Sequence, residues 1–322
     1  IELAPAEVAG TGWISSAGSN RLHNLATSGD GRWLIAQKQS GLFAWDAHTR
    51  RDAKLLDYPG GDPVTLAFLA DGRVIYSSPT IGIRSLRLAL RDGLAAAVDH
   101  QAIHPPDGTH LRGVDAGGRH WIVANGEQTR IELWPGGERA RARQIGPALA
   151  ARQYARLSAD GGLAAIRVSR QSELGLYALP GAELRATLPV QPPAWPTFSP
   201  DGRWLGIAHD ESYDVRDLAA PGQPVWSRKL SAARAIHTQM LFSPDSRRVA
   251  LLVGGSTIEL VEAGTGRTEL TFTLPGGAEW EDWVWAPDGQ TLYLVSGRNE
   301  LHLLHPGAAA AALARLGLDW RG

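Results

Sequence analysis

The stretch FSPDGRWLGIAHD, residues 198–210, places a Pro-Asp-Gly turn between two apolar runs. Proline presets φ for the second position of a type I turn, aspartate tolerates the third, and glycine supplies the positive φ that follows. A type I turn followed by a left-handed glycine is a common connection of a β-hairpin. The stretch therefore predicts a hairpin in which Asp201 turns the chain and performs no chemistry.

This turn recurs along the chain in seven copies, the third of them degraded. The turn positions are Asp30, Asp71, Gly117, Asp160, Asp201, Asp245 and Asp288, separated by 41, 46, 43, 41, 44 and 43 residues. A second alternating run follows each hairpin, as in GLFAWDAHT at 41–49, and such alternation indicates a half-buried strand. A period in the low forties with several short strands per unit is typical of a propeller blade. The sequence therefore predicts one all-β domain over residues 1–322, a seven-bladed β-propeller with four antiparallel strands per blade.

A propeller has to close its ring, because an open ring leaves an unpaired sheet edge. Two terminal segments are candidates for the closing strand, IELAPAEVAGTGWI at 1–14 and the tail at 308–322. The beginning of the tail, AAAAALARLGL at 308–318, has a helical composition. We expect the N-terminal segment to join the last blade, with the C-terminal tail as the alternative.

The repeated pattern, FSPDGRWL followed by a strand that ends in Trp-Asp, resembles that of bacterial WD-repeat and TolB-like propellers over nearly the whole chain. Trp-Asp stands at a strand end once, at Trp45-Asp46, and no Gly-His dipeptide opens a repeat. The resemblance implies the propeller fold and a binding site at one mouth of the central channel. It also implies an exported, periplasmic protein, and the start of the chain at Ile1 fits a cut from a longer precursor. A cytoplasmic domain of a larger protein is the alternative.

Composition narrows the classes of partner. Lys plus Arg number 32 against 33 Asp plus Glu, which gives a formal net charge of −1. A nucleic-acid surface needs clustered positive charge, so we expect no nucleic-acid partner. The chain has no cysteine for thiol or disulfide chemistry. It also has no apolar run of the length that a transmembrane segment requires.

Motifs for catalysis or cofactor binding are absent from the sequence. It contains no phosphate-binding loop, no H-E-x-x-H and no G-x-S-x-G. Three histidines lie close together in VDHQAIHPPDGTH at 98–110, which we interpret as an exposed loop between blades and not as a metal site. We therefore expect no catalytic residue, no cofactor and no metal.

The inner strand of each blade should lead into its turn, so residues six to eight positions before the turn should surround one channel mouth. These positions hold Trp, Tyr, His and Arg, which are types enriched at binding hot spots. A charged residue, Arg112, also interrupts an apolar column five positions before the turn. The expected binding rim comprises His23, Asn24, His110, Arg112, Arg152, Tyr154, Trp195, His237, Gln239, Trp280 and Asp282.

The segment WEDWVW, residues 280–285, is the richest part of this rim. Side chains alternate along a strand, so Trp283 and Trp285 should share one face and fill the gap between blades. Trp280 and Asp282 stand nearer the start of the strand. We expect both of them to be exposed at the rim.

Three functions are compatible with these residues. The first is a non-catalytic scaffold that binds a protein partner at the channel mouth, as a subunit or domain of a larger bacterial assembly. The second is an enzyme or a cofactor-associated subunit of the lactonase or dehydrogenase type, in which His23, His110 and His237 would converge. The third is a sensor of glycans or small molecules that uses the tryptophans of the rim. We expect the first.

Overall fold

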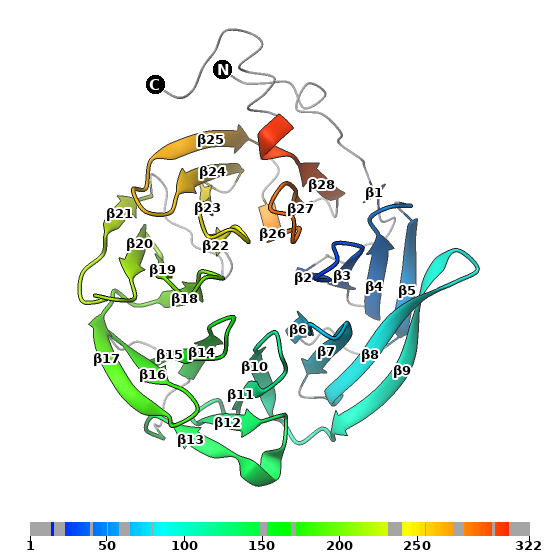
Figure 1. Ribbon diagram of the computed structural model, residues 1–322, viewed down its shortest axis with the longest axis horizontal. Coiled ribbons are helices and arrows are strands. Elements are labelled where there is room, and N and C mark those ends of the chain that lie inside the picture. Colours follow the sequence, from blue (N-terminus) through cyan, green and yellow to red (C-terminus); the bar gives the residue numbers. More distant parts are fainter. Residues whose placement is uncertain are drawn as a thin grey trace, which may run out of the picture.

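The computed structural model describes residues 14–15, 23–38, 41–49, 51–57, 65–78, 80–148, 153–168, 172–230, 240–254, 256–273, 280–297 and 300–308. In these residues, seven four-stranded antiparallel sheets stand around one axis (Figure 1). Figure 1 also shows the first strand of each repeat nearest the axis and the last strand at the periphery. The chain is thus a seven-bladed β-propeller, as the turn spacing predicts.

The blades follow one another in chain order, each running from its inner strand to its outer strand. Blade 1 contains β2 (His23–Thr27), β3 (Trp33–Lys38), β4 (Gly41–Asp46) and β5 (Arg51–Asp57). Blade 2 contains β6 (Thr65–Phe68), β7 (Arg73–Ser78), β8 (Gly82–Arg91) and β9 (Leu94–His104). Blade 3 contains β10 (His110–Val114), β11 (His120–Ala124), β12 (Ile131–Pro135), the 3-10 helix η1 (Arg139–Arg141) and β13 (Arg143–Ile145).

The remaining blades repeat this order. Blade 4 contains β14 (Gln153–Leu157), β15 (Leu163–Val168), β16 (Glu173–Ala178) and β17 (Glu183–Pro189). Blade 5 contains β18 (Ala194–Phe198), β19 (Trp204–His209), β20 (Ser212–Asp217) and β21 (Trp226–Lys229). Blade 6 contains β22 (Met240–Phe242), β23 (Arg248–Val253), β24 (Thr257–Glu262) and β25 (Thr268–Thr273). Blade 7 contains β26 (Trp280–Trp285), β27 (Leu292–Ser296), β28 (Glu300–Leu304) and β1 (Ile14–Ser15).

Blade 7 joins the two ends of the described chain. Its outer strand is β1, in which Ile14 pairs with Leu301 and Ser15 with Glu300. The inner strands of blades 7 and 1 are joined as well, because the Leu25 amide donates a hydrogen bond to Asp282 Oδ2 at 3.0 Å. Residues 1–13 and 309–322, which include most of both candidate closing segments, lie outside the described residues.

Packing between blades explains which strands are apolar throughout. Both faces of a blade are covered by its neighbours, so the second strand is buried on both sides; every residue of β19 is buried, and so is every residue of β27. Outer strands face solvent, and five of the seven residues of β17 are exposed. None of the helices in the described part of the chain is long and apolar enough to cross a membrane.

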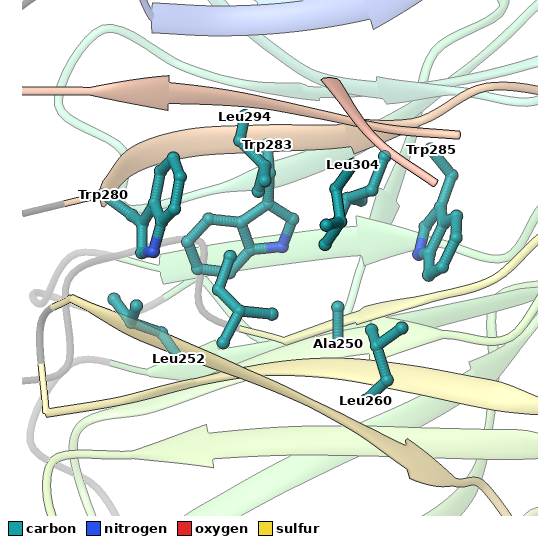
Figure 2. Close-up of a cluster of buried hydrophobic side chains, with 10 residues drawn as sticks. Ala250, Leu252, Leu260, Trp280, Trp283, Trp285, Leu294 and Leu304 are labelled. Carbon is teal, nitrogen blue, oxygen red and sulfur yellow. The ribbon is translucent and has the colours of Figure 1, made fainter. Parts of the chain in front are cut away.

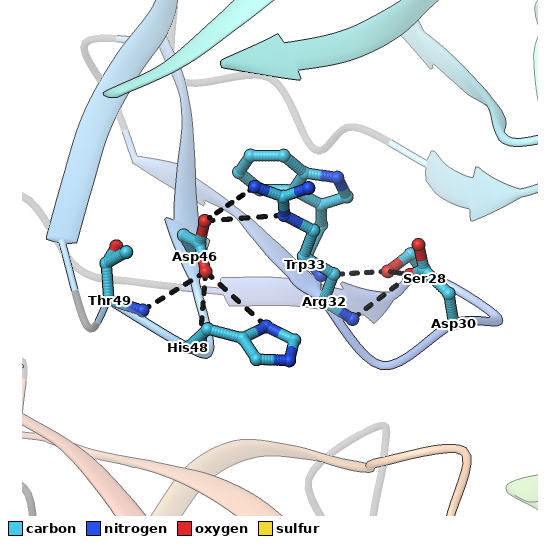
Figure 3. A network of polar contacts seen from close by, with 7 residues as sticks. All are labelled: Ser28, Asp30, Arg32, Trp33, Asp46, His48 and Thr49. Atoms are coloured by element: carbon cyan, nitrogen blue, oxygen red, sulfur yellow. Dashed lines mark hydrogen bonds and ion pairs between the residues drawn. The ribbon is translucent and has the colours of Figure 1, made fainter. Parts of the chain in front are cut away.

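Four of the seven turns share one hydrogen-bond network, shown for blade 1 in Figure 3. The Ser28 hydroxyl donates to Asp30 Oδ1 at 2.5 Å and accepts the Trp33 amide at 2.8 Å, while Asp30 Oδ1 accepts the Arg32 amide at 3.0 Å. The same serine–aspartate bond, at 2.6 Å, recurs in blades 4, 5 and 6. These aspartates are therefore occupied by the turn, as the sequence indicates.

Blade 3 builds the same turn with its carboxylate at a different position. Asp115 occupies the place that serine has in blades 1, 4, 5 and 6, and its Oδ1 accepts the His120 amide at 2.8 Å. Gly117 then stands where the other repeats have aspartate, and Gly118 takes the left-handed conformation with φ +69°. In the degraded copy, a carboxylate two residues upstream of the usual aspartate position thus preserves the hairpin.

Candidate functional site: an arginine–aromatic ladder

Strand direction divides the ring into two faces. The end of the ring at which the inner strands begin is named the strand-start face, and the opposite end, which carries the Asp-Gly turns, is the turn face. Because the four strands of a blade are antiparallel, the links between second and third strands also lie on the strand-start face. The expected binding rim belongs to the strand-start face.

Three of the expected rim residues meet there, on blades 3 to 5. The guanidinium carbon of Arg112 lies over the Tyr154 ring, 5.8 Å from its centre. A residue outside the expected rim, Arg167, lies over the same ring at 4.4 Å and over the Trp195 ring at 5.6 Å. Distances below about 6 Å are those of cation–π pairs. The four residues Arg112, Tyr154, Arg167 and Trp195 are named the arginine–aromatic ladder.

Local irregularity positions the first rung of the ladder. Arg112 stands at a shift in register between Leu111 and Gly113 where β10 pairs with β11. Such a bulge bends the strand and re-aims a side chain. Arg112 also donates a hydrogen bond to the side-chain oxygen of Gln128, in the link between β11 and β12.

The middle of the ladder follows from strand pairing. Tyr154 on β14 pairs directly with Arg167 on β15, and paired residues point to the same face of a sheet. Tyr154 and Trp195 are half-buried, whereas Arg167 is only 3% exposed. Among the described residues, none accepts a hydrogen bond from the Arg167 guanidinium, and its Nε is buried. Burial lowers the pKa of Arg167, while Tyr154 and Asp210 act in the opposite direction.

Trp280 and Asp282 are not exposed, contrary to the expectation from the sequence. Their exposures are 4% and 8%. A shift in register between Trp280 and Asp282 breaks the alternation of β26, so Trp280 joins Trp283 and Trp285 in one apolar cluster between blades 6 and 7 (Figure 2). Its indole N–H donates to the Ser256 carbonyl at 2.9 Å. Both residues therefore hold the ring together and are not available at the rim.

The other expected rim residues lie apart from the ladder or outside the described residues. The Asn24 amide donates to the Gln37 side-chain oxygen at 2.7 Å within blade 1, from a backbone with φ +53°. His110 is half-buried at the start of β10. The side chain of His23 and the whole of Arg152, His237 and Gln239 lie outside the described residues.

The histidines of residues 98–110 form no loop and no metal cluster. His100 and His104 belong to β9, the outer strand of blade 2, which corrects the loop expected from the sequence. His104 Nε2 lies 3.0 Å from Asp107 Oδ2, and Arg139 forms an ion pair with the same carboxylate. No group of three His, Cys, Asp or Glu residues in the described ranges could hold a metal ion.

A cavity of about 510 Å³ lies on the turn face, between blades 7 and 1. Its lining includes Asp30, His48, Asp288 and Tyr293. Asp30 is held by Ser28 and Arg32, and Asp288 accepts the Gln290 amide at 2.8 Å. The carboxylates of this cavity thus already serve the turns, in contrast to the arginine–aromatic ladder.

Comparison with known proteins adds no family to this description. No protein-family model matches the chain, and no curated protein matches it. The seven-bladed propeller and the ladder are therefore the observations on which a function has to rest.

Proposed function

We propose that the chain is a non-catalytic scaffold that binds a protein partner at the strand-start face, as a subunit or domain of a larger assembly. The observation that carries this proposal is the arginine–aromatic ladder, whose rungs come from three successive blades. Aromatic side chains and arginine dominate binding hot spots because they bury a large area and donate several hydrogen bonds. Half-buried Tyr154 and Trp195 still have surface that a partner would cover.

We also propose membership of the bacterial WD-repeat and TolB-like propellers and an exported, periplasmic location. The repeated turn sequence supports this membership, because the Ser-x-Asp hydrogen-bond network recurs in four blades. The location follows from that resemblance alone. Fractionation of the native cells tests it, and recovery of the protein with cytoplasmic markers would contradict it.

Photo-crosslinking in the native host tests the binding surface. The photoreactive residue p-benzoylphenylalanine replaces Trp195, and in a matched control it replaces Leu184, which is 56% exposed on the outer strand β17. We expect one defined protein adduct from position 195 and none from position 184. Adducts of equal yield at both positions, or none at position 195, would refute the proposed surface.

A further inference from the structure

Arg167 combines two properties that are costly together in a folded protein. Its guanidinium is charged at any ordinary pH and carries five N–H donors. It is 97% buried, and no residue in the described ranges accepts a hydrogen bond from it. Cation–π contacts with Tyr154 and Trp195 compensate part of the desolvation, but they satisfy no N–H group. A buried group that lowers the stability of the fold in this way is typical of a functional site.

A second arginine lies beside Arg167 on the same blade. Arg156 lies on β14 two residues after Tyr154, so both point to the same face of blade 4. Arg156 pairs with Ala165 while Tyr154 pairs with Arg167, which makes the two arginines diagonal neighbours within reach of one small group. The Arg156 side chain is solvent-accessible, although the protein that surrounds it lowers its pKa by desolvation.

Four exposed carboxylates also stand on the strand-start face of blades 3 to 5, those of Glu127, Glu173, Asp210 and Glu211. Asp210 follows β19 on the strand-start face and acts on Arg167 only through its charge. Asp282, also on an inner strand, is buried, and its oxygens accept the Leu25 and Trp283 amides. None of the carboxylates in the described residues accepts a hydrogen bond from Arg167, so its N–H donors are still without an acceptor.

From these observations we infer that the arginine–aromatic ladder, together with Arg156, binds a carboxylate of an acidic segment in the protein partner. This inference rests on the proposed function, because it names the chemistry of that partner. A carboxylate accepts two parallel N–H bonds from one guanidinium, which is the strongest pairing that arginine makes. It would satisfy donors of Arg167 and leave the rings of Tyr154 and Trp195 to pack against the neighbouring residues of the segment.

Two labelled peptides and three variants test the inference by fluorescence anisotropy. The probes are a fluorescein-labelled peptide of glutamates and a peptide of glutamines of equal length. The variants are Arg167→Met, Arg167→Lys and, as a matched control, Arg203→Met. Arg203 also lies over an indole ring, that of Trp204 at 4.2 Å, but it follows the Asp201 turn on the opposite face. Arg167→Lys keeps the charge and loses the planar fork.

We expect the glutamate peptide to bind about tenfold more tightly than the glutamine peptide. Arg167→Met should abolish this preference, Arg167→Lys should weaken it, and Arg203→Met should leave it unchanged. Arg167→Met should melt no lower than the wild type, because it removes a buried charge that is only partly compensated. Equal binding of the two peptides by the wild type, or an unchanged preference in Arg167→Met, would overturn the inference.

A melting experiment with glutarate distinguishes a carboxylate that belongs to a protein segment from one that belongs to a small molecule. Suppose that glutarate raises the melting temperature of the wild type but not of Arg167→Met, and that the glutamate peptide does not bind. The ligand is then a small free carboxylate, and the acidic segment of a protein partner is refuted. If crosslinking from position 195 succeeds while Arg167→Met has no effect on either probe, the binding surface stands and the carboxylate inference fails. The two proposals therefore fail on different results.

Discussion

Replacement of Trp280 by alanine distinguishes the core position that the structure shows from the rim position that alternation indicates. The side chain is 4% exposed and packs with Trp283 and Trp285 between blades 6 and 7. A tryptophan buries about 200 Å², and at about 25 cal/mol per Å² the loss is about 5 kcal/mol. Measured tryptophan-to-alanine changes in cores span about 3 to 5 kcal/mol, which agrees. We therefore expect Trp280→Ala to lower the free energy of unfolding by about 4 kcal/mol, measured by urea denaturation.

A matched tryptophan provides the control for this measurement. Trp226 also donates its indole N–H to a backbone carbonyl, that of Ala263 at 2.8 Å, but it is half-buried on the outer strand β21. Trp226→Ala should therefore cost clearly less than Trp280→Ala. Trp280→Phe, which fills much of the site, keeps the measurement possible if the alanine variant does not fold. A loss below about 1 kcal/mol for Trp280→Ala, or one no larger than that of Trp226→Ala, would refute the core position.

Three further predictions concern the turns and the contacts between blades. The pKa of Asp201 is lowered despite the opposing effect of burial, because the Ser199 hydroxyl and the Arg203 amide donate hydrogen bonds to its carboxylate. The stabilisation by this carboxylate is present above the ordinary pKa of 3.8 and is lost as the pH falls through the lowered pKa. The urea midpoints of Asp201→Asn and the wild type should therefore converge in acid. Tyr213→Phe should lower the free energy of unfolding, measured by urea denaturation, by about 1 to 3 kcal/mol, because the buried Leu252 carbonyl loses the hydroxyl donor that lies 2.7 Å away. An unchanged urea midpoint would show that this hydrogen bond contributes nothing to stability. Asp282→Asn should lower the melting temperature. The two carboxylate oxygens of Asp282 accept the Leu25 and Trp283 amides, and the single oxygen of an asparagine side chain cannot replace both. An unchanged melting temperature would argue against this junction between blades 7 and 1.

The fold was predictable from the turns because their chemistry is local. An aspartate followed by a residue of positive φ sets backbone angles without help from distant residues, so the regular spacing of such turns in the low forties counts the blades. The degraded third copy could also be recognised as a turn, since Asp115 stands two residues before Gly117 and supplies a hydrogen-bond acceptor. A single sequence does not reveal that this acceptor takes over the role of a serine, because the role depends on the position of the His120 amide.

The site was predictable only in part, because bulges and pairing partners are not local. One shift in register on β26 places Trp280 in the core, and another on β10 accompanies the contact of Arg112 with Tyr154. Arg167 lies outside the expected rim because it belongs to β15, a second strand, whereas the positions that precede the turns belong to inner strands. The signal was a charged residue in IRVS at 166–169, within an otherwise apolar second strand. A buried strand with one arginine raises the question of what neutralises it.

The pairing of β1 with β28 has a consequence for the order in which the molecule forms. Residues 14–15 leave the ribosome before any blade exists, yet their partner strand is the last to be made. The Leu25–Asp282 bond spans 257 residues in the same way. Contacts between such distant residues carry the largest loop-closure entropy and form late, so blades 1 to 6 must remain together while the ring is still open. During that interval the apolar faces of blades 1 and 6 that blade 7 will cover are exposed to other nascent chains, and the rate of the final closure sets how long the protein is at risk of aggregation.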